Sequence, residues 1–275
     1  MKSYGWEMEL SWRDRIEDFN YGVRFTLADG QRKVLKYPNE SGDIYSWYNN
    51  KLDGTIWGYT TVGIAQTQEE MNAHLANNKP NWGSNWGAGD IMYADLNGDG
   101  EVTSGSKTLN DHGDLKIIGN SYARYNFGFT VDGSWRGLDF SIFLQGTMKR
   151  DYWLDGPYFW GASGDEWQSA CFTEHLDYWT PEHTNAYYPK PYFGNIKKNQ
   201  EVQSGYLQNA AYLRVKNVQV GYTLPKSWTK KAAMESVRFY VSGDNLLTWT
   251  GISSIFDPET LGGDWGPGKL YPLQR

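Results

Sequence analysis

The chain alternates apolar and polar residues over unusually long stretches, and this pattern restricts its fold more than any other feature. A period of two residues is typical of β-strands that have one apolar face and one polar face. Six stretches show the pattern, over positions 6–12, 21–27, 125–131, 138–144, 214–222 and 237–241. Polar segments at 14–18 and 133–137 predict hairpin turns within the first four stretches. We therefore predict an all-β, antiparallel fold.

The length of these strands favours a membrane setting. Each strand is expected to reach about ten residues or slightly more, and a tilted strand crosses a bilayer with ~9–11 residues. No run of 18 apolar residues exists in the chain, so a membrane-spanning helix is excluded. The 14 Trp and 20 Tyr residues suit the aromatic girdles of a membrane barrel, but equally a sugar-binding face or a protein interface. Alternation alone also fits a soluble β-sandwich.

Two long insertions separate the predicted strands, at 29–121 and 149–205. Short turns on one side and long insertions on the other are the asymmetry of an outer-membrane barrel. In a compact soluble domain, two insertions of this length would be unusual. Within them we expect short helices at 68–75, after Thr67 as N-cap, and near 166–176.

One loop has the pattern of a calcium site. Asp95, Asn97 and Asp99 provide oxygen atoms at alternate positions, Gly100 permits a sharp turn, and Glu101 follows with its backbone carbonyl. The twelfth position is occupied by serine rather than by the bidentate glutamate of an EF-hand, and Asp114 is a candidate replacement. We predict a Ca²⁺ site at Asp95, Asn97, Asp99, Glu101 and Asp114. A metal-free turn built from Asp, Asn and Gly is the alternative.

Other features argue against nucleic-acid binding and against catalysis. The net charge of −6 does not suit a nucleic-acid partner. The single cysteine, Cys171, cannot form an intrachain disulfide and lacks metal-ligand spacing around it. The Glu174-His175 and Glu182-His183 pairs do not match a zinc-protease motif, and the chain has no nucleophile elbow around Ser163. We expect a protein that is not an enzyme and has no catalytic residues.

Several blocks in order resemble the SusC/RagA family of TonB-linked outer-membrane proteins of Bacteroidetes. The residues that carry this resemblance are Gly54–Thr61, Tyr93–Gly100, Gly113–Ser121, Arg124–Phe129, Trp135–Ser141, Phe143–Gly146, Tyr212–Asn217, Gly243–Thr248, Phe256–Glu259 and Tyr271–Arg275. They extend over nearly the whole chain, which makes the resemblance far more specific than any single block.

The resemblance implies a fold and a set of partners. Residues 1–275 would be the C-terminal portion of a TonB-dependent receptor β-barrel, with the plug domain and the final strand absent. The segments 29–121 and 149–205 would be extracellular loops. The whole protein would lie in the cell outer membrane, in contact with lipid, and would use TonB and a SusD-like surface lipoprotein to import glycan oligosaccharides or peptides in nutrient uptake and polysaccharide utilisation.

The two faces of the strands distinguish this interpretation from its main alternative, a soluble carbohydrate-binding β-module with a calcium-stabilised loop. A barrel predicts that one apolar set faces lipid, while Asn126, Asp132, Asp139 and Gln145 face a lumen. A soluble module would bury the apolar set between two sheets. That set consists of Tyr125, Phe127, Phe129, Leu138, Phe140 and Ile142.

Overall fold

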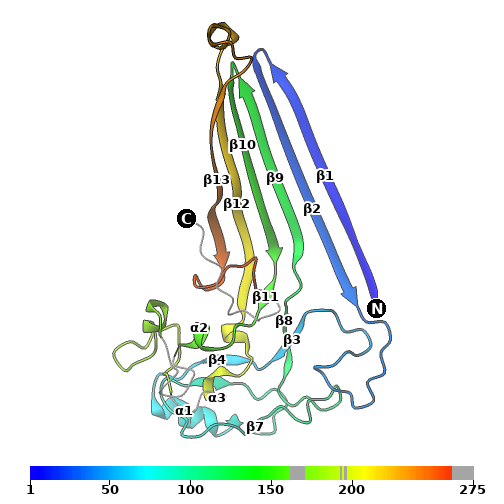
Figure 1. Ribbon diagram of the computed structural model, residues 1–275. Coiled ribbons are helices and arrows are strands. Elements are labelled where there is room, and N and C mark those ends of the chain that lie inside the picture. The colour runs from blue at the N-terminus through cyan, green and yellow to red at the C-terminus, as the bar shows by residue number, and fades with distance from the viewer. Residues whose placement is uncertain (162–170, 193, 195–196, 262–275) are drawn as a thin grey trace.

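A computed structural model describes residues 1–161, 171–192, 194 and 197–261 of the chain. It consists of one long antiparallel sheet and a body of loops and short elements at one end of that sheet (Figure 1). The other end carries only the short connections between neighbouring strands. We call these two ends the loop end and the hairpin end.

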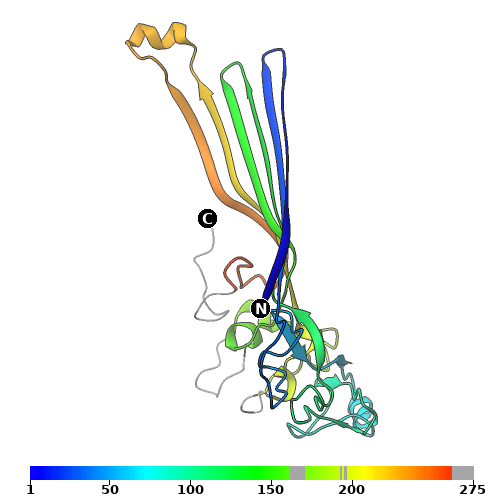
Figure 2. The ribbon, with the colours of Figure 1, turned by 90° about the vertical axis from the view of Figure 1, so that its right-hand side faces the viewer.

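The long sheet confirms the predicted all-β, antiparallel fold. Its long strands follow one another in the order β1 (Lys2–Ile16), β2 (Phe19–Lys33), β9 (Arg124–Trp135), β10 (Leu138–Lys149), β12 (Gln208–Thr223) and β13 (Arg238–Gly251). The short β11 (Asp151–Tyr152) pairs with the first residues of β12. All neighbours are antiparallel, and β1 and β13 are open edges of the sheet as described. Figure 2 shows that the sheet curves along its width.

The strands are longer than the alternation predicted. β1 and β2 have 15 residues each, β12 has 16, and β9 and β10 have 12. Polar residues extend the strands at the loop end, where ion pairs hold neighbouring strands together. Arg124 of β9, for example, contacts Asp29 of β2 at 2.5 Å. Alternation marks only the part of a strand with two chemically different faces, so it misses such extensions.

The register gathers the apolar residues on one face. Val23, Val131, Ile142 and Val218 lie side by side on four successive strands. The same register puts Phe127, Phe129, Leu138 and Phe140 on this apolar face, and Asn126, Asp132, Asp139 and Gln145 on the opposite, polar face. The ladder skips Tyr125, whose φ is 56°, so the predicted placement of this residue does not follow from the register.

The apolar face is exposed rather than covered by protein. On the outer strands β1 and β13, Ile16, Trp12, Phe239 and Val241 are 62%, 63%, 64% and 78% exposed, while most apolar side chains of the central strands β9 and β10 are half-buried by their neighbours. In the described part of the chain, the other sheets are three two-stranded pairs within the loop body, so none forms a second layer against the long sheet. The expected core of a sandwich is therefore missing from the described structure.

The hydrophobic core lies in the loop body instead. Its buried residues come from both long insertions and from the segment that follows β13, and they include Ile44, Trp57, Tyr93, Val102, Leu154, Phe159, Trp160, Tyr206 and Phe256. The two insertions thus fold together as one packed unit (Figure 1).

Short elements build this body. They are β3 (Thr55–Gly58), β4 (Thr61–Ile64), α1 (Gln68–Leu75), β5 (Lys79–Pro80), β6 (Ile91–Tyr93), β7 (Glu101–Val102), β8 (Lys116–Asn120), α2 (Pro157–Trp160), η1 (Thr173–Leu176), α3 (Lys197–Gln200) and η2 (Ser204–Tyr206). At the hairpin end, α4 (Lys226–Thr229) and η3 (Lys230–Ala232) lie between β12 and β13.

The first predicted helix is confirmed, with its cap. α1 covers the predicted residues, and the Thr67 hydroxyl accepts a hydrogen bond from the Glu70 amide at 3.1 Å, as an N-cap does. The second predicted helix, near 166–176, falls partly on residues 162–170, which lie outside the described residues. Its described part is the single 3₁₀ turn η1. Within the described ranges, the helices are all too short to cross a bilayer.

Candidate functional site

The polar face of the long sheet carries ion pairs that link its strands. Arg24 of β2 contacts Glu9 of β1 at 2.7 Å, and Arg238 of β13 contacts Asp139 of β10 at 2.5 Å. The second pair joins strands that are not neighbours, because β12 lies between them. Gly221 of β12 stands opposite Asp139, and a Cβ atom on it would clash with the Arg238 guanidinium. A glycine is therefore required for this pair to pass over the intervening strand.

A second pair uses the same arrangement near the hairpin end. Arg13 of β1 lies 3.8 Å from Asp132 of β9, and Gly22 of the intervening β2 is opposite both residues. A Cβ atom on Gly22 would come within 2.9 Å of the Asp132 carboxylate. Both glycines thus leave the polar face open for charged side chains that reach across a strand.

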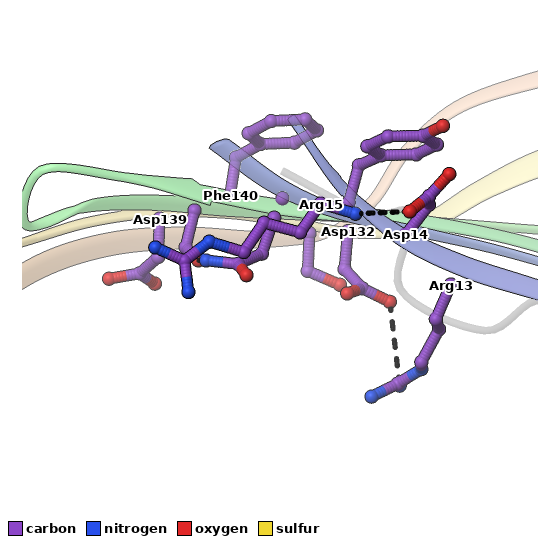
Figure 3. Close-up of a pocket in the computed structure, with 11 residues that line it drawn as sticks. Arg13, Asp14, Arg15, Asp132, Asp139 and Phe140 are labelled. Carbon is purple, nitrogen blue, oxygen red and sulfur yellow. Dashed lines mark hydrogen bonds and ion pairs between the residues drawn. The ribbon is translucent and has the colours of Figure 1, made fainter. Parts of the chain in front are cut away.

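A hollow of about 720 Å³ opens beside Arg13 and Asp132 (Figure 3). Figure 3 shows Arg13 and Asp132 on one side of the strands and Phe140 on the other. Polar groups of both charge signs line the hollow, including Arg15, Asp139, Ser134 and Ser141. Such a surface can hold a polar partner or solute through hydrogen bonds and ion pairs.

At the loop end, the polar face anchors the segment that follows β13. The Arg214 guanidinium, only 3% exposed, contacts Asp257 at 2.8 Å and Glu259 at 2.7 Å. Lys216 also reaches Glu259, at 3.0 Å. A guanidinium that contacts carboxylates through paired hydrogen bonds holds them in a defined orientation. They hold residues 252–261 on the side toward which the sheet curves (Figure 2).

A fully buried ion pair joins the two insertions. The Lys198 ammonium lies 2.7 Å from the Asp90 carboxylate, and both side chains are 0% exposed. Lys198 also donates to the Asn85 carbonyl at 2.6 Å, and Asn199 donates to Asp90 at 3.0 Å. Because a buried charge without partners is very costly, this network ties α3 to the segment before β6.

The predicted calcium residues gather in one loop. Asp95 accepts hydrogen bonds from the amides of Asn97 (3.0 Å), Gly98 (2.7 Å) and Gly100 (2.8 Å). The amide of Gly100 foremost, with those of Gly98 and Asn97, lowers the pKa of Asp95. Asp99 accepts from the Glu101 amide at 2.9 Å.

Asp114 joins this loop from a distant position. It is fully buried, and its two oxygens accept hydrogen bonds from the amides of Leu96 (2.6 Å) and Thr103 (2.7 Å). These carboxylates are thus engaged by backbone amides, which is how Asx-type turns are stabilised. Over the described ranges, no group of three or more His, Cys, Asp or Glu side chains is arranged to hold a metal. The Ca²⁺ site stays a prediction.

Comparison with known proteins identifies relatives of the whole chain. TonB-dependent receptor P3 of Formosa agariphila is 26% identical over 276 residues, which covers 94% of this chain and 25% of the receptor. TonB-dependent receptor SusC of Bacteroides thetaiotaomicron is 21% identical, over 96% of this chain and 24% of SusC. The chain is SusC/RagA-like. No family model matches it.

Solved structures support the same architecture for the SusC/RagA-like chain. The RagAB peptide importer in its open-open state superposes with a TM-score of 0.62 at 19% identity, over 95% of this chain and 26% of the RagAB chain. The structure of the RagAB peptide transporter gives a TM-score of 0.60. The fold is therefore that of part of an antiparallel β-barrel, matching about a quarter of the RagAB chain. The chain spans about a quarter of the length of the curated relatives it matches.

The contacts between the two insertions could not be predicted from the sequence. Lys198 and Asp90 lie far apart in the sequence, and neither belongs to a motif. The available signal was aromatic density: Trp82 and Trp86 stand in a Gly/Asn/Trp tract, and Trp82 packs against Tyr93 at 5.2 Å between ring centroids. So many aromatic residues in an insertion predict a packed core.

Proposed function

We propose that the chain forms part of the wall of a TonB-dependent outer-membrane transporter. In this proposal, residues 1–275 are its C-terminal barrel portion, the apolar face contacts lipid, and the polar face lines the lumen. One observation carries the proposal: the long sheet exposes its apolar face, while the hydrophobic core lies in the loop body. An apolar surface of this extent needs a partner, and lipid is a partner that covers every strand of the sheet alike.

The strand dimensions support this role. Twelve residues of β9 extend over roughly 40 Å at ~3.3 Å per residue. At the ~40° tilt of barrel strands, this length crosses the ~30 Å hydrocarbon core. Aromatic residues lie near both ends of the apolar face, with Trp135 and Phe239 at the hairpin end and Trp6 and Trp249 toward the loop end. This distribution is typical of the two aromatic girdles.

The loop body would then be extracellular, and the hairpin end periplasmic. A SusD-like lipoprotein would bind the loop body, TonB would supply the energy, and the cargo would be glycan oligosaccharides or peptides. The names of the relatives support a receptor or transporter and not an enzyme. The peptide cargo stated for RagAB supports the peptide class, and the glycan class rests on the resemblance of the sequence to the SusC/RagA family.

A soluble carbohydrate-binding module is the alternative, and its buried sheet face has no counterpart in the described residues.

Purification from outer membranes in mild detergent tests the proposal. A tag in the loop body should recover a surface lipoprotein together with the protein. Uptake of labelled oligosaccharide or peptide mixtures by cells should stop when the gene is deleted, and also when the proton-motive force is dissipated. Uptake that persists after deletion, together with recovery of the protein without any lipoprotein, would contradict the proposal.

A further inference from the structure

A narrow apolar groove opens on the apolar face at the hairpin end. Phe19, Trp135, Leu138 and Phe140 line a groove of about 330 Å³ with almost no polar surface. Gly133 lies beneath it, where a Cβ atom would come within 2.6 Å of the Phe140 ring and 3.2 Å of the Phe19 ring. The missing side chain lets both rings lie down on the sheet. The groove has the chemistry to hold a hydrocarbon chain and nothing polar.

A cation stands at the rim of this groove. The guanidinium of Arg136 lies 5.5 Å from the ring centroid of Trp135, one of the lining residues. It also contacts Asp18 at 2.9 Å, and its side chain is 68% exposed. A guanidinium binds phosphate oxygens in pairs, and an exposed pair with a carboxylate is weak enough to be shared.

The connection between β12 and β13 carries more cations at the same end of the sheet. The Thr223 amide, at the end of β12, donates to the Gly137 carbonyl at 2.7 Å, so the connection begins beside the turn that carries Arg136. It contains exposed lysines and exposed apolar side chains, but a single glutamate, Glu235. Those residues are Lys226, Lys230 and Lys231, with Trp228 at 62% and Met234 at 46% exposure. Lysines beside exposed Trp and Met are typical of a segment at a membrane surface.

We propose that the hairpin end holds an anionic phospholipid in a defined site. One acyl chain occupies the groove between Phe19, Trp135, Leu138 and Phe140, and the phosphate contacts Arg136. Arg136 at the groove, with the lysines at the same end of the sheet, selects an anionic headgroup over a zwitterionic one. This inference rests on the proposed function, which places the groove at a membrane surface.

Native mass spectrometry of the detergent-extracted protein tests the site. The probes are phosphatidylglycerol and phosphatidylcholine with identical acyl chains, added at equal concentrations. The wild-type protein should retain phosphatidylglycerol preferentially. Arg136→Gln should reduce that preference about fivefold, the effect of one basic group near a charged lipid. Leu138→Ala should weaken retention of both lipids alike, because it changes the groove and not the charge.

Arg32 provides a matched control at the opposite end of the sheet. It pairs with Asp53 at 2.6 Å and lies 5.3 Å from the Tyr122 ring, so it repeats the surroundings of Arg136 without an adjoining groove of this kind. Arg32→Gln should leave the lipid preference unchanged. Equal retention of the two lipids, or equal losses in Arg136→Gln and Arg32→Gln, would overturn the inference. Neither result bears on the proposed function, which fails instead if the protein is recovered in water without detergent.

Discussion

Arginine placed at different depths on the apolar face should reveal the bilayer. Val131 lies at the middle of the apolar positions of β9, between Val23 and Ile142 in the register. A lipid-facing arginine costs ~2–4 kcal/mol at the bilayer midplane and ~0–1 kcal/mol near the interface. Val131→Arg should therefore shift the unfolding equilibrium roughly 30- to 700-fold, at about 1.4 kcal/mol per tenfold.

Two further variants complete this test. Leu138 stands on the same face at the hairpin end, so Leu138→Arg should cost no more than ~1 kcal/mol. Ser141 stands on the polar face opposite Asp132, so Ser141→Arg gains a carboxylate neighbour and should be nearly neutral.

Denaturant unfolding in lipid vesicles, followed by tryptophan fluorescence, measures all three costs. If the apolar face were covered by protein, Val131→Arg and Leu138→Arg should lower the stability alike, because the cost would not depend on the distance from a bilayer centre. Equal losses for these two variants would therefore refute the lipid assignment. A loss for Ser141→Arg as large as that for Val131→Arg would refute the assignment of the two faces.

The remaining predictions concern the loop body. Lys198→Met leaves Asp90 charged and buried, so urea unfolding should show that the free energy of unfolding falls by ~3–5 kcal/mol. Adding Asp90→Asn to this variant should restore part of the loss. A Lys198→Met variant as stable as the wild type would contradict the role of the pair. The pKa of Asp95 is lowered from 3.8, so its hydrogen bonds stabilise the loop fully above that value and are lost as the pH falls through the lowered pKa. The protection of the Gly100 amide, measured as its exchange rate relative to the intrinsic rate at each pH, should therefore stay constant above pH 3.8 and fall only at lower pH; protection that is lost above pH 3.8 would contradict this role of Asp95. If the Asp95 loop binds Ca²⁺, calcium should raise the melting temperature of the wild type and not of Asp95→Asn, and equal responses would remove the metal prediction.

The sequence predicts the long sheet well because its signal is local. Each strand carries its own alternation, and a hairpin turn determines which strand follows it. Alternation is enough to assign the apolar sets of β9 and β10 to a common face, since a period of two fixes every second residue. Tyr125 is an exception, because its left-handed backbone conformation interrupts the pairing of β9 with β10 at the start of β9.

The loop body is less predictable because its contacts join distant segments. The sequence predicts the insertions as separate loops, yet Asp90 of one and Lys198 of the other share a buried ion pair. Pairing of this kind depends on the folded surroundings and leaves no periodic pattern. In the sequence, Asp114 is only a candidate calcium ligand, and its hydrogen bonds to the amides of Leu96 and Thr103 are contacts that no motif indicates.

Fractionation of the source cells tests the central claim most directly. An antibody against residues 171–192, which lie in the loop body, should detect the protein in the outer-membrane fraction and leave the soluble fraction blank. The band should run several times heavier than the 31.5 kDa of this chain, because the chain spans about a quarter of its relatives. A band of 31.5 kDa in the soluble fraction would contradict the assignment of the long sheet to a membrane transporter.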